Sequence, residues 1–194
     1  PFREDDLYNG YPDAASAPYG IAKLAALEML RACHAQLGLK AAYVVPVNLY
    51  GPGDNIDPAT SHFVGALVDR CVRAIREKSP TLECWGTGSP TREFLYVDDA
   101  AEGVVRAAEL IDDPTPINLG SGEEFSIREV VDAVVEQSGY RGEVVWDATK
   151  PDGVGRRCLD STRARKLLGW TAAISLEEGL RRTIEWRRSL RKDA

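Results

Sequence analysis

The spacing of apolar residues divides the beginning of the chain into a helix followed by a buried strand. From Ser16 to Leu37 apolar side chains recur at helical spacing, and Gly38 follows where a helix is expected to end. Residues 39–47 then form a nearly continuous apolar run, which is typical of a strand buried on both faces of a parallel sheet. Because a helix leading into a buried strand is the repeating unit of α/β proteins, the pattern predicts an α/β fold.

The rest of the chain alternates amphipathic helical stretches with short apolar runs. Helices are predicted to begin at Thr60 or Ser61, Asp98 or Asp99, Ser126, Thr162 and Ser175. Strands are predicted at residues 82–85, 93–97, 116–119 and 144–146. Two helices open with capping boxes, in which a serine hydroxyl and a carboxylate three residues later satisfy free amides. These pairs are Ser126 with Glu129 and Ser175 with Glu178.

Composition excludes several classes of protein. The 194 residues are 44% hydrophobic, and their net charge of -6 argues against general nucleic-acid binding, which depends on a positive surface. The four cysteines are scattered and the two histidines do not cluster, so the sequence indicates no zinc site and no disulfide framework. No apolar run approaches the roughly 20 residues of a membrane span. We therefore expect a cytoplasmic protein with reduced thiols, no metal and no membrane partner.

A run of basic residues near the C-terminus is interpreted as favourable pairing with the dipole of the last helix rather than as a binding patch. These residues are Arg181, Arg182, Arg187, Arg188, Arg191 and Lys192.

Tyr19 and Lys23 are the first candidates for chemistry. They are four residues apart on a predicted helix, so the phenol and the ammonium share one face, about one turn apart. A nearby cation favours the phenolate, which would allow Tyr19 to exchange a proton with a carbonyl or alcohol near neutral pH. An exposed pair without a role is the alternative, because the chain contains seven tyrosines and such a spacing can arise by chance.

The order of motifs around this pair resembles the extended short-chain dehydrogenase/reductase family. A Y-x-x-x-K helix is followed by a buried strand and then by an N-x-Y-G-P stretch at residues 48–52. By this resemblance, Tyr19 is the proton donor or acceptor and Lys23 also holds the nicotinamide ribose. Three further residues would lie beside the nicotinamide and the sugar: Pro46, Asn48 and Leu49.

Later motifs narrow the resemblance to one branch of the family, whose members epimerise GDP-4-keto-6-deoxy-mannose at the two carbons beside the ketone and then reduce the ketone with NADPH. The motifs are Ser61-His62, W-G-T-G at 85–88, R-E-F at 92–94 and K-P-D-G at 150–153. The resemblance implies a GDP-sugar substrate and NADP as cofactor. NAD is not excluded, because the residues that read the ribose 2' position would lie upstream.

Within that resemblance, His62 matches the acid of the epimerisation step, and an imidazole can change its charge near neutral pH. We expect His62 in the first turn of its helix, and a capping or packing histidine is the alternative. Four residues match positions that approach the diphosphate, sugar or nucleotide: Arg70, Trp85, Arg92 and Lys150. Guanidinium groups suit phosphate oxygens, whereas Trp85 could equally be a buried core residue.

Some parts of the family's machinery have no counterpart in this sequence. There is no strand-linked Gly-x-x-Gly-x-x-Gly to hold a pyrophosphate. The Ser or Thr that completes the catalytic group and the Cys that serves as epimerisation base lie upstream of the Y-x-x-x-K helix in the family, and neither is present. The chain also begins at Pro1 rather than Met. We therefore expect a piece of a longer enzyme, inactive alone and a homodimer when complete.

The resemblance also implies the domain organisation: the C-terminal part of a Rossmann-type parallel sheet plus a smaller α/β substrate-binding domain. Residues 1–50 and 98–122 are assigned to the Rossmann-type domain, and residues 51–97 and 123–194 to the nucleotide-sugar-binding domain. Two alternatives stay open. One is another nucleotide-sugar enzyme of the same superfamily, such as a UDP-hexose 4-epimerase or a GDP-mannose 3,5-epimerase. The other is a binding module that retains a sugar-nucleotide pocket without redox chemistry.

Overall fold

The computed structural model describes residues 1–12, 14, 16–58 and 60–190 of the chain. Its first elements are η1 (Glu4–Tyr8), α1 (Ala17–Leu37), β1 (Tyr43–Pro46), β2 (Asn48–Tyr50), α2 (Phe63–Glu77), β3 (Thr81–Trp85) and β4 (Thr91–Tyr96). They are followed by α3 (Val97–Leu110), β5 (Pro116–Leu119), β6 (Glu124–Ser126), α4 (Ile127–Ser138), β7 (Glu143–Asp147), β8 (Arg156–Arg157), α5 (Thr162–Leu168) and α6 (Leu176–Ser189). Parallel strand pairs combined with helices confirm the predicted α/β class.

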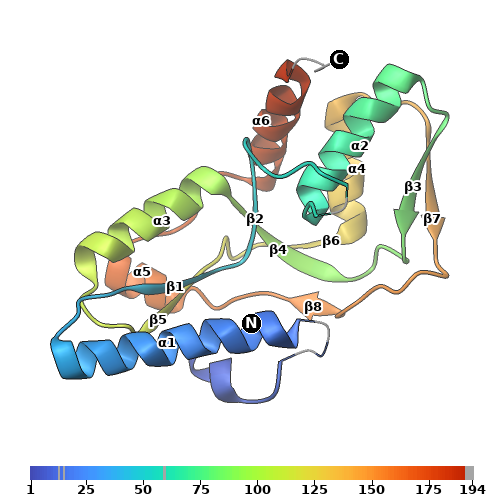
Figure 1. Ribbon diagram of the computed structural model, residues 1–194. Coiled ribbons are helices and arrows are strands. Elements are labelled where there is room, and N and C mark those ends of the chain that lie inside the picture. Colours follow the sequence, from blue (N-terminus) through green and yellow to red (C-terminus); the bar gives the residue numbers. More distant parts are fainter. Residues whose placement is uncertain (13, 15, 59, 191–194) are drawn as a thin grey trace.

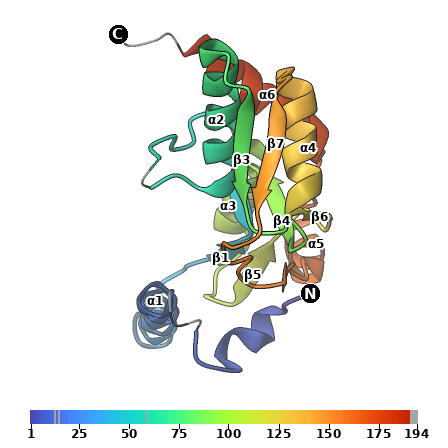
Figure 2. The same ribbon diagram turned by 90° about the vertical axis from the view of Figure 1, so that its right-hand side faces the viewer.

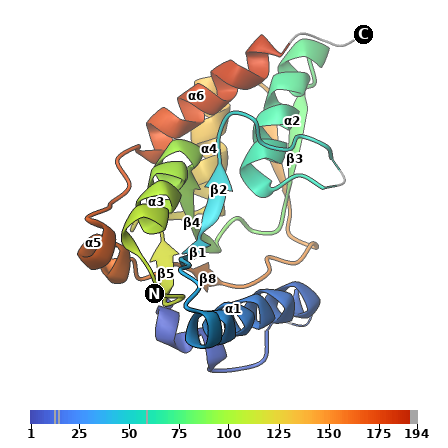
Figure 3. The ribbon, with the colours of Figure 1, turned by 60° about the vertical axis from the view of Figure 1, so that its left-hand side comes forward.

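Strand β4 connects two parts of the molecule. It pairs in parallel with β2 and β8 and antiparallel with β6, while β1 pairs in parallel with β5 and β3 with β7. In Figure 1 the upper part holds the β3–β7 pair with α2, α4 and α6, and the lower part holds α3, α5 and the β1–β5 pair. Helix α1 lies at the lower edge of the molecule in all three ribbon views (Figures 1, 2 and 3).

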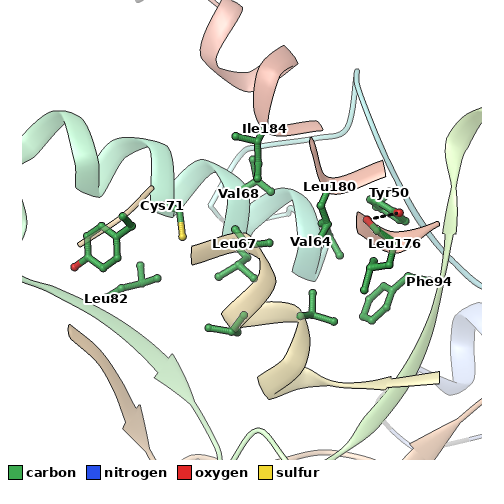
Figure 4. Close-up of a cluster of buried hydrophobic side chains, with 14 of the residues drawn as sticks. Tyr50, Val64, Leu67, Val68, Cys71, Leu82, Phe94, Leu176, Leu180 and Ile184 are labelled. Carbon is green, nitrogen blue, oxygen red and sulfur yellow. Dashed lines mark hydrogen bonds between the residues drawn. The ribbon is translucent and has the colours of Figure 1, made fainter. Parts of the chain in front are cut away.

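Each part has its own cluster of buried apolar side chains. In the upper part α2, α4 and α6 pack together, with Leu67 and Val68 facing Leu180 and Ile184 (Figure 4). Each of these four side chains is at most 2% exposed, so its burial stabilises the fold by roughly 1.5–3 kcal/mol. In the lower part the buried Trp170 packs in a cluster formed by α3, α5, β4 and β5. Strand β4 contributes Phe94 and Tyr96 to the first cluster and Leu95 to the second, so the two clusters lie on its opposite faces.

Several helix ends follow the predicted local signals. Gly38 ends α1 in a left-handed conformation, and Ser126 and Glu129 form the expected capping box at the start of α4. The second capping box is only half formed. Ser175 accepts from the backbone N–H of Glu178 at 3.3 Å, but the Glu178 carboxylate accepts from two arginines of the next turn instead of returning to the cap. Ion pairing therefore replaces the reciprocal bond.

The strand predicted at residues 39–47 differs from the structure in length and burial. Only Tyr43–Pro46 of this run forms a strand, β1, and a second strand, β2, begins just beyond it at Asn48. Val47 between them donates its N–H to the main-chain carbonyl of Leu119. Tyr43, Val44 and Val45 are only partly buried, so the prediction of a strand buried on both faces is wrong for this chain. Among the described residues β1 has a single strand neighbour, β5, and this leaves its other edge accessible.

One of the basic residues near the C-terminus is not at the surface. Arg187 is 8% exposed and forms an ion pair with the buried Asp69 of α2, with 2.6 Å between Nη2 and Oδ1. Dipole pairing was therefore the wrong interpretation for Arg187, because the nearby carboxylate binds its guanidinium directly. Arg191 and Lys192 lie outside the described residues.

The cysteines are free thiols, and burial raises the pKa of Cys71 to about 11. Within the described part of the chain, no group of three or more His, Cys, Asp or Glu side chains could hold a metal ion. No helix there is both long enough and apolar enough to cross a membrane.

Candidate functional site

A cavity of about 1020 Å³ lies where β1, β2, α2, β3 and β4 meet the segment from Pro151 to Leu159. Eight of the ten predicted site residues line it: Tyr19, Pro46, Asn48, Leu49, His62, Arg70, Trp85 and Arg92. Lys23 and Lys150 do not line the cavity, but each lies next to a residue that does. The tertiary structure thus brings together residues that are spread over more than a hundred positions of sequence.

Helix α1 positions Tyr19 and Lys23 at one side of the cavity. The Lys23 Nζ atom lies 5.3 Å from the centroid of the Tyr19 ring, so the predicted pairing of phenol and ammonium on one face is present. Tyr43 of β1 donates its hydroxyl to the main-chain carbonyl of Lys23 at 2.8 Å, which ties α1 to the sheet. The side chain of Tyr19 is 69% exposed and remains accessible to a ligand.

The β1–β2 junction forms the floor of the cavity beside α1. Pro46 pairs with Leu119 of β5, whereas Asn48 pairs with Phe94 of β4, so the chain changes strand partner at Val47. Such points at the carboxyl ends of strands are the usual place for ligand crevices in open α/β sheets. The Asn48 side-chain amide donates to the main-chain carbonyl of β4 at 2.8 Å, which fixes its orientation in the floor.

His62 lies at the N-terminus of α2 but not within its first turn. Its backbone is extended, with φ -81° and ψ 166°, and Phe63 is the first helical residue, so the expectation of a first-turn histidine is wrong. The imidazole makes no capping hydrogen bond, which also excludes the alternative of a capping histidine. An N-cap residue projects away from the helix axis, and in this position the exposed ring faces the cavity.

Two arginines lie side by side on neighbouring strands. Arg92 of β4 is paired in register with Arg157 of β8, and both line the cavity. Burial lowers the pKa of Arg92, and the charge of Arg157 lowers it further. Arg70 approaches from α2 and donates to the main-chain carbonyl of Glu83. Guanidinium groups gathered in a partly desolvated cavity form a favourable environment for an anion such as a phosphate.

Trp85 and Lys150 form part of the rim. Trp85 is 67% exposed, so the alternative of a buried core residue is wrong. The Lys150 Nζ atom lies 5.6 Å from the centroid of the Trp85 ring, within the range of a cation–π contact. An exposed indole beside an ammonium group offers a stacking surface to a planar ligand at the cavity mouth.

Asp152 joins the loop that carries Lys150 to the turn that follows Trp85 at the end of β3. Its carboxylate accepts from the backbone N–H of Thr87 at 2.6 Å and from the Thr87 hydroxyl at 2.7 Å. These bonds, the backbone bond first, hold the pKa of Asp152 below its usual range. A Cβ atom at Gly86 would lie 2.2 Å from the same carboxylate, and Gly86 has a φ of +79°, so only glycine allows this close approach.

Sequence reasoning missed Arg157 and the contact of Asp152 with Thr87. Arg157 belongs to a strand of two residues, too short to leave a periodic signal. Asp152 and Thr87 are 65 positions apart. Both lie inside motifs of the resemblance, at 150–153 and 85–88, whereas Arg157 comes four residues after the first of these.

The scaffold of helices and parallel strand pairs, with a Tyr–Lys pair on the helix that precedes β1, defines a Rossmann-like α/β protein. Residues 1–120 match the NAD dependent epimerase/dehydratase family. The chain belongs to that family.

The chain is similar to GDP-L-fucose synthase of Escherichia coli (strain K12), with 40% identity over 195 residues, covering 96% of this chain and 60% of that protein. A crystal structure of a GDP-L-fucose synthetase from Naegleria fowleri superimposes with a TM-score of 0.91 at 26% identity, covering 100% of this chain and 61% of that one. Its form bound to NADP gives a TM-score of 0.86, covering 96% of this chain and 60% of that one.

UDP-glucose 4-epimerase of Thermotoga maritima, solved with UDP-glucose, gives a TM-score of 0.79 at 31% identity, covering 89% of this chain and 53% of that one. The chain thus spans about 60% of the length of the GDP-L-fucose synthases that it matches.

Proposed function

We propose that this chain provides the sugar-nucleotide-binding part and the Tyr–Lys pair of an NADP-dependent GDP-4-keto-6-deoxy-mannose 3,5-epimerase and 4-reductase. The observation that carries the proposal is that one cavity is lined by Tyr19, His62 and Arg92, with further predicted site residues around them. The similarity to GDP-L-fucose synthases supports the choice of a GDP-sugar. The domain division made from the sequence is part of this proposal.

In this proposal the cavity binds the two ends of the substrate differently. Arg92 and Arg70 bind the diphosphate, because partly desolvated guanidinium groups form strong, charge-assisted bonds with phosphate oxygens. Trp85 and Lys150 contact the nucleoside at the rim. The sugar then extends toward Asn48 and lies between His62 and Tyr19, the two side chains that can transfer protons.

The chemistry assigned to this chain is proton donation by two groups. At each of the two epimerised carbons, His62 donates a proton from the face opposite a base that removes one. Tyr19 gives its proton to the ketone oxygen during reduction, and the Lys23 ammonium favours the phenolate that results.

The reduced cofactor, NADPH, would supply the hydride for that reduction when bound. The open crevice lined by Pro46, Asn48 and Leu49 beside Tyr19 is suited to the nicotinamide end of the cofactor. This sequence contains no glycine fingerprint for the pyrophosphate. We therefore expect the chain by itself to bind a GDP-sugar without turning it over.

We retain the homodimer of the complete enzyme as a prediction. Ile21, Met29 and Leu37 of α1 are 44%, 68% and 78% exposed, so the helix presents apolar surface.

A UDP-hexose 4-epimerase is the second candidate, supported by the superposition on the Thermotoga maritima enzyme. Calorimetric titration of the chain with GDP and with UDP separates the two proposals. We expect GDP to bind at least about tenfold more tightly, a difference of about 1.4 kcal/mol. Equal affinities, or a preference for UDP, would contradict the assignment to a GDP-sugar.

We predict that Asp152→Asn weakens GDP binding roughly fivefold at pH 7. The amide directs a donor toward Thr87, which itself supplies two donors, so the loop carrying Lys150 separates from the turn that follows Trp85. Because the folded pKa of Asp152 is lowered, its bonds are fully present above the ordinary carboxyl pKa of about 4 and are lost as pH falls through the lowered value. Wild-type affinity should therefore not vary through Asp152 between about pH 5 and 8.

Asp160→Asn is the matched control for that prediction. The pKa of Asp160 is also lowered, by bonds from Thr162 at the start of α5, but Asp160 does not line the large cavity. We expect wild-type GDP affinity from this variant, measured by the same titration. Equal losses from the two variants would refute a specific role for Asp152.

A further inference from the structure

Glu93 is a fully buried carboxylate directly behind the arginines of the cavity. It follows Arg92 on β4, has 0% exposure and does not line the cavity. Its Oε1 atom accepts from the backbone N–H of Gly122, and its Oε2 atom from the backbone N–H of Leu159, both at 2.7 Å. Its main-chain carbonyl accepts from the side chain of Asn48. A single residue therefore binds three separate segments around the site.

The segment held through Leu159 is the one that carries Arg157. Strand β8 is only two residues long, so its own pairing with β4 provides few hydrogen bonds. Within that pairing Arg92 and Arg157 occupy opposed positions, where two like charges repel each other. A strand this short, bearing a charge that repels its neighbour, needs an additional contact to remain in register.

The Glu93 carboxylate is suited to provide that contact. It lies behind the two guanidinium groups and accepts from an amide only two residues beyond Arg157. The turn that supplies its other donor is packed closely on it, since a Cβ atom at Gly120 would lie 2.3 Å from Oε1. The Glu93 carboxylate is thus held in place by the turn at Gly122 on one oxygen and by the Leu159 amide on the other.

We propose that Glu93 is a positioning residue that holds β8 against β4, so that Arg92 and Arg157 are presented together to the diphosphate of a sugar nucleotide. The inference rests on the proposed function for the identity of that ligand. Glu93 does not touch the ligand and acts through Arg157. Loss of the carboxylate releases Arg157 from its place opposite Arg92, and anion affinity falls as a result.

Inorganic pyrophosphate is the probe, titrated calorimetrically into wild-type chain and variants. Glu93→Ala is compared with Asp99→Ala, because Asp99 is also a buried carboxylate that accepts from two backbone amides, those of Ala173 and Ile174. Asp99 does not line the cavity. Both variants should lower the melting temperature, but only Glu93→Ala should reduce pyrophosphate affinity, by about tenfold or more. Equal loss of affinity in the two variants would overturn the proposal.

Glu93→Gln serves where the alanine variant does not fold, since it keeps the volume and removes one of the two acceptors. It is measured in wild-type and in Arg157→Met backgrounds, because groups that act through one another are not additive. We expect about tenfold loss of pyrophosphate affinity in the first background and less than about twofold in the second. The same loss in both backgrounds would mean that Glu93 acts only on general stability, and would reject the inference.

These outcomes separate the inference from the proposed function. A chain whose pyrophosphate affinity depends on Glu93 and Arg157 but that prefers UDP to GDP would support the inference and contradict the GDP assignment. A chain that prefers GDP, and whose pyrophosphate affinity is unchanged by Glu93→Gln, would support the GDP assignment and contradict the inference. Failure of the wild-type chain to bind pyrophosphate at all would overturn the inference.

Discussion

Replacing Arg92 by methionine is expected to weaken GDP binding about a hundredfold, or about 2.7 kcal/mol. Methionine fills a similar volume without charge, so the variant removes the charge-assisted bonds and leaves the packing of β4 in place. Arg92 is partly desolvated already, as its lowered pKa indicates, and therefore loses little hydration when it pairs with a phosphate. Calorimetric titration with GDP measures the loss.

Arg106→Met is the control for that experiment. Arg106 lies on α3, does not line the cavity, and donates its Nε–H to Glu102 at 2.9 Å. Its GDP affinity should stay within about twofold of wild type. Melting temperatures identify any general loss of structure. Arg92→Met removes a repulsion and should not lower the melting temperature, so wild-type GDP affinity in this variant would refute the binding role of Arg92.

Arg187→Met is expected to lower the free energy of unfolding by about 3 kcal/mol. Arg187 Nε and Nη2 lie 2.7 and 2.6 Å from Asp69 Oδ1, and both side chains are almost completely buried between α6 and α2. Removing one partner leaves the other charge in a site that water barely reaches, which is more costly than losing an exposed pair. Urea denaturation followed by circular dichroism measures the change.

Arg73→Met tests whether burial decides that effect. Arg73 bonds to the second oxygen of the same carboxylate at 3.0 Å, but its own side chain is 46% exposed. Its replacement should lower the free energy of unfolding by less than about 1 kcal/mol, because the exposed Arg73 was already largely hydrated and Asp69 keeps its buried partner Arg187. Equal losses in the two variants would contradict the buried-pair explanation.

Elements that depend on neighbours in sequence were predictable. The start of α5 at Thr162, the helix-ending Gly38 after α1 and the Ser126–Glu129 capping box all agree with prediction. In contrast, η1, β6 and β8 were missed. β6 and β8 have only two or three residues each and exist because β4 supplies their hydrogen-bond partners. No periodicity can develop over such lengths.

The candidate site likewise has residues that the sequence predicted and contacts that it did not. Motif order predicted eight residues that line one cavity, and the Tyr19–Lys23 pair follows directly from helical geometry. The order of motifs did not predict that Arg157 lies opposite Arg92. It also did not predict that the buried Glu93 carboxylate binds the segment just beyond Arg157. Those contacts join segments about 65 positions apart, and any of several loop paths would satisfy the sequence pattern between them.

The sequence by itself determined the α/β class, the helix ends and the motifs that mark the family, because each depends on interactions within about one helical turn or on a run of adjacent residues. Only the tertiary structure decided which charges are buried, as for Asp69 and Arg187, and which lie together at the cavity, as for Arg92 and Arg157. The physical reason is that burial and charge pairing depend on distance in space. For residues far apart in the chain, that distance is set by the packing of the whole fold rather than by local sequence.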